Sequence, residues 1–206
     1  MIWISISIIF LIYFIDQLTK WLVQANMVFQ SSNTVINGFL TIEYQFNPGM
    51  AWSLLDNATW VLVLVSAVAS IALGYAVLKN DFKHAKLYSI GTSVAFAGCI
   101  GNLFDRAISI MPYFTDSNLV YKNSSWRILD GATTNFMPKG RNGVVDMISF
   151  EPLNALSRLI TKSNFPVFNV ADAALVIGLI LFAIDIIFFY DKRKKQMKEA
   201  KVNGNN

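Results

Sequence analysis

Four long apolar segments restrict what this chain of 206 residues can fold into. Each is close to the roughly 20 residues that an α-helix needs to cross a bilayer. They cover about residues 2–23, 60–78, 87–107 and 167–190. Hydrophobic residues make up 54% of the chain and charged residues only 15%, which is more apolar than a water-facing surface tolerates. The sequence therefore predicts a single integral membrane domain over residues 1–206, an all-α protein built as a bundle of four transmembrane helices.

The basic residues predict how these spans are oriented. The turn at 79–86 holds three lysines and the tail at 191–206 holds six lysines and arginines, whereas the loop at 24–59 holds none. Short segments rich in Lys and Arg stay in the cytoplasm. We therefore expect both termini and the turn in the cytoplasm, and the loops at 24–59 and 108–166 outside. The net charge of +4 then reflects topology, and we expect no nucleic-acid partner.

Ionisable side chains within the spans point to a functional site. A charged group at bilayer depth costs at least about 2.5–3.5 kcal/mol, so such residues usually face the protein interior or water. Asp16 and Lys20, four residues apart on one helix face, lie near the outer end of the first span. Asn102 and Arg106 lie at the same depth on the third span, and Asp172 reaches it about five residues into the fourth. Each alone also fits helix packing or an arginine that reaches the headgroups, but their convergence favours a site near the outer face.

The segment G-V-V-D-M-I-S-F places a further carboxyl group, Asp146, in an apolar stretch of the second outer loop. An isolated aspartate there is more often a cap or turn residue, but this one can also fold back over Asp172. Two close carboxyl groups in a partly desolvated site share one proton, so one serves as general base and the other as general acid. Such a pair can deprotonate a water molecule for attack on a peptide carbonyl and protonate the departing amine.

Other hydrolytic chemistry has little support in the sequence. His84, the only histidine, lies in the turn expected in the cytoplasm, so no serine or cysteine near the outer face can use a histidine base. The sole cysteine, Cys99, falls within the third span, and no motif supplies the nitrogen and sulfur ligands of a zinc site. We therefore expect no metal and no cofactor.

Five motifs together resemble the lipoprotein signal peptidases, also called signal peptidase II. They are D-Q-L-T-K at 16–20, N-P-G-M-A-W-S at 47–53, A-G-C-I-G-N-L-F-D-R at 97–106, V-V-D at 144–146 and F-N-V-A-D at 168–172. The resemblance implies an aspartic endopeptidase of the bacterial inner membrane. Such an enzyme removes the signal peptide from prolipoproteins, cutting just before a lipobox cysteine that carries a diacylglyceryl group.

The resemblance also implies roles for individual residues. Asp146 and Asp172 would be the catalytic pair. Residues at other motif positions would bind substrate, orient the pair or hold the shape of the site: Asn102, Arg106, Asn169, Asp16, Lys20 and Asn47. The family fold adds a small extracytoplasmic β-rich cradle, expected here mainly over 35–53, where Asn47 would lie near the lipidated cysteine. Besides the prolipoprotein, only membrane lipids are expected as partners, and the protein is expected to be a monomer.

The chain departs from the family pattern in two places. The usual N-x-G-A-A-F-S motif has the bulkier Met50 and Trp52 here, which can alter the shape of the cradle. The segment at 107–143 is far longer than the usual link and enlarges the second outer loop. It can be a lid, a partner-binding insert or functionally inert, since loops tolerate insertion.

Two other classes of protein remain compatible with carboxylates in membrane spans. A proton-coupled transporter would hold them near the bilayer midplane, with broken helices and internal repeats, which the sequence does not show. A membrane scaffold would have no need for Asp146 and Asp172 together. Neither class of protein would have proteolytic activity, so replacing either aspartate by Asn would leave proteolysis unaffected.

Overall fold

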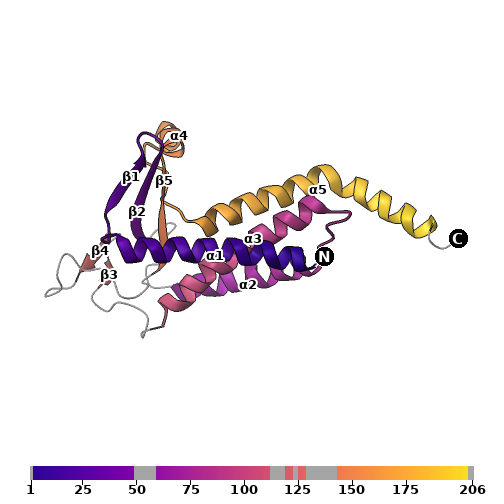
Figure 1. Cartoon of the computed structure of the whole chain (residues 1–206), viewed down its shortest axis with the longest axis horizontal. Coiled ribbons are helices and arrows are strands. Elements are labelled where there is room, and N and C mark those ends of the chain that lie inside the picture. The colour runs from indigo at the N-terminus through magenta and orange to yellow at the C-terminus, as the bar shows by residue number, and fades with distance from the viewer. Residues whose placement is uncertain (1, 49–58, 112–118, 123–124, 129–142, 204–206) are drawn as a thin grey trace.

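The computed structural model describes residues 2–48, 59–111, 119–122, 125–128 and 143–203. Its four long helices are α1 (Ile2–Asn26), α2 (Thr59–Leu78), α3 (Lys86–Ser109) and α5 (Val170–Asn203). They lie side by side as a bundle with a small sheet at one end (Figure 1). This architecture confirms the predicted four-helix membrane protein, because all four helices are long and apolar enough to cross a bilayer.

Helix α3 lies at the centre of the bundle. Its most apolar stretch is 56% buried, against at most 17% for the other three helices, which turn large apolar side chains outward. Small residues allow α5 to approach it closely. A Cβ atom on Gly91 would lie 2.7 Å from the backbone nitrogen of Phe182, so a larger residue would force α3 and α5 apart. This close packing brings the polar ends of α3 and α5 together.

The small sheet has the antiparallel order β1-β2-β5. Its strands are β1 (Ser32–Ile36), β2 (Leu40–Asn47) and β5 (Val144–Phe150). The first two confirm the expected cradle, and residues 49–53 of that region lie outside the described residues. The third strand was not predicted as a strand and carries Asp146, which pairs in register with Gln45. Aromatic residues of β2 pack with the end of α1 and with β5 in one core: Val23, Met27, Phe29, Tyr44, Phe46, Val145 and Met147.

The second outer loop contains more regular structure than the sequence predicted. Strands β3 (Leu119–Lys122) and β4 (Ser125–Ile128) form a separate antiparallel pair. The rest of the insertion between 112 and 142 lies outside the described residues. After β5 comes a short helix, α4 (Glu151–Thr161), which also was not predicted.

Helix α5 begins later and ends later than the predicted span at 167–190. Its first residue is Val170, so Asp172 lies in the first helical turn rather than a full turn inside the span. The start of α1 and the end of α5 lie on the side of the bundle opposite the sheet (Figure 1). The start of the first helix and the end of the last are therefore on the same side, as expected for a chain that crosses a membrane four times.

Candidate active site

Asp146 is held at the junction of the sheet and the bundle. It lies in the first half of β5, where four consecutive residues are buried, and its side chain is 3% exposed. Its Oδ2 accepts a hydrogen bond of 2.9 Å from Asn47 Nδ2 on the neighbouring strand β2. Its Oδ1 accepts one of 2.6 Å from Asn169 Nδ2, just before α5. The carboxyl group is thus fixed from both sides by amides.

The start of α5 positions the second carboxyl group. Asn169 Oδ1 accepts a hydrogen bond of 2.8 Å from the backbone N–H of Asp172, and Asp172 Oδ2 accepts one of 3.2 Å from the backbone N–H of Asn169. These reciprocal bonds form a capping box, which fixes the first turn of a helix. Asn169 therefore caps α5 and also reaches Asp146, so a single side chain connects the two aspartates.

Asn102 of α3 extends this network to the bundle core. Its Nδ2 donates to Asp172 Oδ1 at 2.7 Å. Its Oδ1 accepts hydrogen bonds from Asn169 Nδ2 at 3.2 Å and from Lys20 Nζ at 3.3 Å. The predicted convergence of the first, third and fourth spans at one depth is therefore present in the structure.

A buried ion cluster lies directly beneath Asn102. Lys20 Nζ is 2.8 Å from Asp16 Oδ2 and 2.7 Å from Asp105 Oδ2, and all three side chains are at most 1% exposed. Asp16 Oδ1 also accepts a hydrogen bond of 2.9 Å from the backbone N–H of Ala171. Charges buried this deeply persist only when they are paired and hydrogen-bonded. The cluster thus ties α1, α3 and α5 together below the two aspartates.

Arg106 and two residues without a predicted role complete the contacts around the site. Arg106 donates from Nη1 to Ser66 Oγ of α2 at 2.9 Å, whereas its neighbour Asp105 contacts Lys20. Asp105 was given no role from the sequence. Gln17 was also missed, and it donates from Nε2 to Asp16 at 3.0 Å and to Asp105 at 3.3 Å. The spacing of Asp105 three residues after Asn102 was the signal that both share a face of α3.

The environment of Asp146 favours its protonated form. Burial, and then the negative charge of Asp172, raise the pKa of the Asp146 carboxyl group to about 7. The hydrogen bonds from Asn47 and Asn169 oppose this rise. The influence of Asp172 on this pKa shows that the two carboxyl groups are electrostatically coupled. Within the described residues, no group of three or more His, Cys, Asp or Glu side chains could hold a metal ion.

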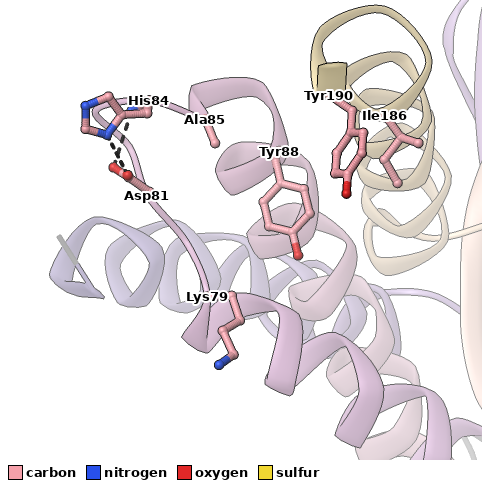
Figure 2. A pocket seen from close by; sticks show the side chains of 7 residues that line it. All are labelled: Lys79, Asp81, His84, Ala85, Tyr88, Ile186 and Tyr190. Atoms are coloured by element: carbon pink, nitrogen blue, oxygen red, sulfur yellow. Dashed lines mark hydrogen bonds and ion pairs between the residues drawn. The ribbon is translucent and has the colours of Figure 1, made fainter. Parts of the chain in front are cut away.

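Two hollows differ in their relation to this network. An apolar groove of about 320 Å³ is lined by residues from α1, β2, β5 and α5, among them Val23, Ile42, Met147 and Val170. Met147 and Val170 directly adjoin the polar network in sequence. The other hollow, of about 530 Å³, lies at the far end of α3, beside His84, Tyr88 and Tyr190 (Figure 2). Of these two hollows, the first adjoins Asp146 and Asp172.

Four long apolar helices joined at one end by buried carboxyl groups and amides define the class: a multi-pass membrane protein with a buried carboxyl site. The family model described as signal peptidase (SPase) II matches residues 8–188. The chain belongs to the signal peptidase II family, whose members are membrane proteases that remove signal peptides from prolipoproteins.

Individual proteins show the same relationship. The chain is 31% identical over 192 residues to a lipoprotein signal peptidase of Enterococcus faecalis, covering 93% of this chain and 89% of that protein. It is 28% identical over 181 residues to one of Bacillus subtilis, covering 88% and 91%.

Two solved structures of bacterial membrane enzymes obtained by the in meso method are similar in fold. The structure at 2.3 Å resolution has a TM-score of 0.59, with 26% identity and coverage of 89% of this chain and 87% of that chain. The structure at 1.9 Å resolution has a TM-score of 0.61, with 26% identity and coverage of 90% and 93%.

Proposed function

We propose that this protein is an aspartic endopeptidase that cuts diacylglyceryl-modified prolipoproteins just before the lipidated cysteine, with Asp146 and Asp172 as its catalytic pair. The observation that carries this proposal is the position of Asn169. Its side chain donates to Asp146, and its backbone N–H donates to Asp172. Two carboxyl groups held by one residue, on separate elements, form a fixed site for general acid–base catalysis.

The pair would hold one proton, carried by Asp146. The pKa of Asp146 is raised to about 7, so this group is about half protonated at neutral pH and largely protonated below it. Asp172 is less buried than Asp146 and accepts hydrogen bonds from Asn102 and Asn169, which suit a carboxylate. This arrangement supplies a general acid and a general base together.

The reaction follows from these two protonation states. Asp172 removes a proton from a water molecule, whose oxygen forms a bond to the carbonyl carbon of the scissile peptide. Asp146 donates its proton as the carbon–nitrogen bond breaks, and the amine of the cysteine departs. The proton taken by Asp172 then passes to Asp146, which restores the starting state of the pair. No covalent bond forms between the enzyme and the substrate. Asn102 is placed to keep Asp172 directed at the water, because its Nδ2 holds Oδ1.

The remaining predicted site residues would support this chemistry without taking part in proton transfer. Asn47 holds Asp146 from the cradle side. Asp16 and Lys20 fix the relative positions of α1, α3 and α5. Arg106, bound to Ser66, would brace the outer end of α3 against α2.

The apolar groove beside the network supports a lipid-modified substrate. It begins next to Met147 and Val170, one or two residues from the proposed catalytic pair, and opens along α1 at Leu22 and Val23. Acyl chains on the cysteine would lie in this groove while the peptide bond meets the aspartates.

We further propose that the sheet end of the bundle faces outward and that both termini are cytoplasmic in the bacterial inner membrane. The lysines of the turn at 79–86 and of the tail lie at the opposite end from the sheet, which supports this orientation (Figure 1). Asn47, Asn102, Asn169 and both aspartates come from one chain, which supports a monomeric enzyme acting within a single membrane domain.

The direct test is cleavage by the purified protein in detergent. A diacylglyceryl-modified prolipoprotein is compared with its unlipidated precursor, and the products are mapped by mass spectrometry. We expect a single cut just before the cysteine, in the lipidated substrate only. A wild-type protein that is folded yet inactive on both substrates would contradict the proposal and favour transport or scaffolding.

A further inference from the structure

Helix α4 is amphipathic, with its two faces cleanly separated. At 100° per residue, its polar residues fall on one side of the helix and its apolar residues on the other. The polar face holds Glu151, Asn154, Ser157, Arg158 and Thr161. The apolar face holds Pro152, Leu153, Ala155, Leu156, Leu159 and Ile160.

The apolar face of α4 is turned away from the protein, whereas part of its polar face is buried. Asn154, on the polar face, is only 4% exposed and donates to Ser149 and to Glu151. Leu159 and Ile160, on the apolar face, are 83% and 75% exposed. A helix on the surface of a water-soluble domain turns its apolar face to the core. An apolar face turned away from the protein therefore implies a medium or partner that accepts apolar side chains.

The position of α4 identifies that medium. The three-stranded sheet extends sideways from the end of the bundle, and α4 lies at its far tip rather than above the helices (Figure 1). This places α4 near the level where the spans end, but outside the outline of the bundle, where the surface of a surrounding bilayer would lie. The adjacent end of β1 also exposes apolar side chains, with Val35 60% and Ile36 51% exposed.

Contacts join α4 and the β1–β2 turn into one continuous surface. The backbone N–H of Glu151 donates to Phe39 O at 3.0 Å, and the rings of Phe39 and Phe150 meet edge to face with centroids 4.7 Å apart. Basic residues border the apolar face. Arg158 pairs with Glu151 at the exposed polar edge, and Lys162 is exposed where the helix ends.

We propose that α4 is an in-plane membrane anchor: Leu156, Leu159 and Ile160 insert between phospholipids of the leaflet next to the sheet, with Arg158 and Lys162 at the phosphates. Helices of this kind bind by apolar burial together with attraction to anionic headgroups. Long basic side chains at such an interface place their charges among the headgroups.

The anchor would also hold the strand that carries Asp146. Phe150, the last residue of β5, directly precedes Glu151, the first residue of α4, so no loop separates the strand from the helix. A seated α4 would then fix the height of β5 relative to the membrane surface. This consequence, unlike the anchor itself, rests on the proposed function.

Fluorescence quenching in lipid nanodiscs tests the anchor without any substrate. Leu159→Cys and Thr161→Cys, each in a Cys99→Ser background, are labelled with an environment-sensitive dye. The nanodiscs contain phosphatidylglycerol and phosphatidylethanolamine, with or without lipids that carry a nitroxide near the headgroup. Thr161 is the matched control, since it is also exposed but lies on the polar face.

The proposal predicts blue-shifted emission and several-fold stronger quenching at position 159 than at position 161. Equal, weak quenching at both positions would overturn it. Quenching at position 159 only by a nitroxide on an added lipidated substrate would show that substrate, not bilayer lipid, occupies the face. Energy transfer between labelled copies would instead show a second chain there. Because no cleavage is measured, failure of the anchor is distinguishable from failure of the peptidase proposal.

Discussion

Two clusters of buried polar side chains at opposite ends of α3 differ in the charged groups that they contain. At the end near the turn, Asn80 donates to Ser5 Oγ at 2.9 Å and to Ser93 Oγ at 3.0 Å, and accepts from Thr92 Oγ1 at 2.8 Å. At the sheet end, Lys20 lies among carboxyl groups and amides. Both clusters connect helices, so polar contacts within the spans do not by themselves indicate chemistry.

The difference lies in the balance of charge. The neutral cluster around Asn80 consists of amide and hydroxyl groups that satisfy one another. The charged cluster combines Lys20 with four carboxyl groups, those of Asp16, Asp105, Asp146 and Asp172. Lys20 contacts only the first two, and in the proposed mechanism Asp146 and Asp172 reduce their repulsion by sharing a proton. Surplus carboxyl groups, rather than polarity, distinguish the proposed active site.

Removing the cation of the charged cluster is expected to have the largest effect. Lys20→Met leaves Asp16 and Asp105 buried without their partner, which costs about 3–5 kcal/mol. Thermal unfolding in detergent should show a large loss of stability, whereas Lys79→Met, at an exposed site, should change little. An unfolding temperature of Lys20→Met equal to that of the wild type would show that the ion cluster does not hold the helices together.

The dual role of Asn169 can be separated with two variants. Asn169→Ser keeps a residue that caps helices but is too short to reach Asp146, whereas Asn169→Ala removes both functions. Loss of a hydrogen bond to an ionisable group costs about 1.5–3 kcal/mol, so both variants should lose roughly 10- to 150-fold in kcat. Only Asn169→Ala should also lose stability. Full activity in Asn169→Ser would show that the contact with Asp146 is not needed for catalysis.

The neutral cluster should affect folding and not catalysis. Asn80→Ala removes hydrogen bonds worth about 0.6 kcal/mol each within a membrane, for a total near 2 kcal/mol. Chemical or thermal unfolding should detect this loss, while kcat at a temperature where the protein is folded stays at the wild-type value. Asn26→Ala, an exposed site on α1, is the control. A selective fall in kcat would mean that the two clusters are coupled through α3.

The smallest expected effect concerns pH. The pKa of Asp146 is raised from 3.8 to about 7, so the protonated acid is present below that value, and kcat/KM should fall about tenfold per pH unit above it. Asn47 opposes the rise, so Asn47→Ala should move this alkaline limb upward by less than about one pH unit. A shift to lower pH would mean that Asp146 is not the group that loses the proton.

The raised pKa also affects folding. Because the folded state binds this proton more tightly than the unfolded state, the free energy of unfolding contributed by Asp146 should fall as pH rises from about 4 to about 7.

Features set by local spacing could be predicted from the sequence. The pairing of Asp16 with Lys20 follows from a separation of four residues, and the shared depth of Asn102 follows from counting along a span. The start of α5 was placed too early, at 167, although N-x-x-D over Asn169 to Asp172 is close to a capping box and marks a helix that begins at Val170. The periodic pattern of Leu156, Leu159 and Ile160 also indicates α4, which the sequence analysis did not predict.

Features set by contacts between distant segments could not be predicted from spacing. The pairing of β5 with β2 joins residues about a hundred positions apart, and nothing local in V-V-D specifies that partner. The direction of Arg106 toward Ser66, with Asp105 turned to Lys20 instead, depends on how α2 packs against α3. Packing between helices, and not spacing along the sequence, thus determines that Asp105 contacts Lys20 while Arg106 contacts Ser66.

The central claim is that Asp146 and Asp172 act together on the peptide bond. The most direct measurement is single-turnover cleavage of lipidated prolipoprotein by three variants: Asp146→Asn, Asp172→Asn and the double variant. Asp81→Asn is the matched control, a carboxyl group at the far end of α3, paired with His84. Each single variant should stay folded and lose roughly 10²- to 10⁴-fold or more in rate, with the double variant little slower than either, as expected for residues that act as a unit. Cleavage by either single variant at close to the rate of Asp81→Asn would contradict the claim.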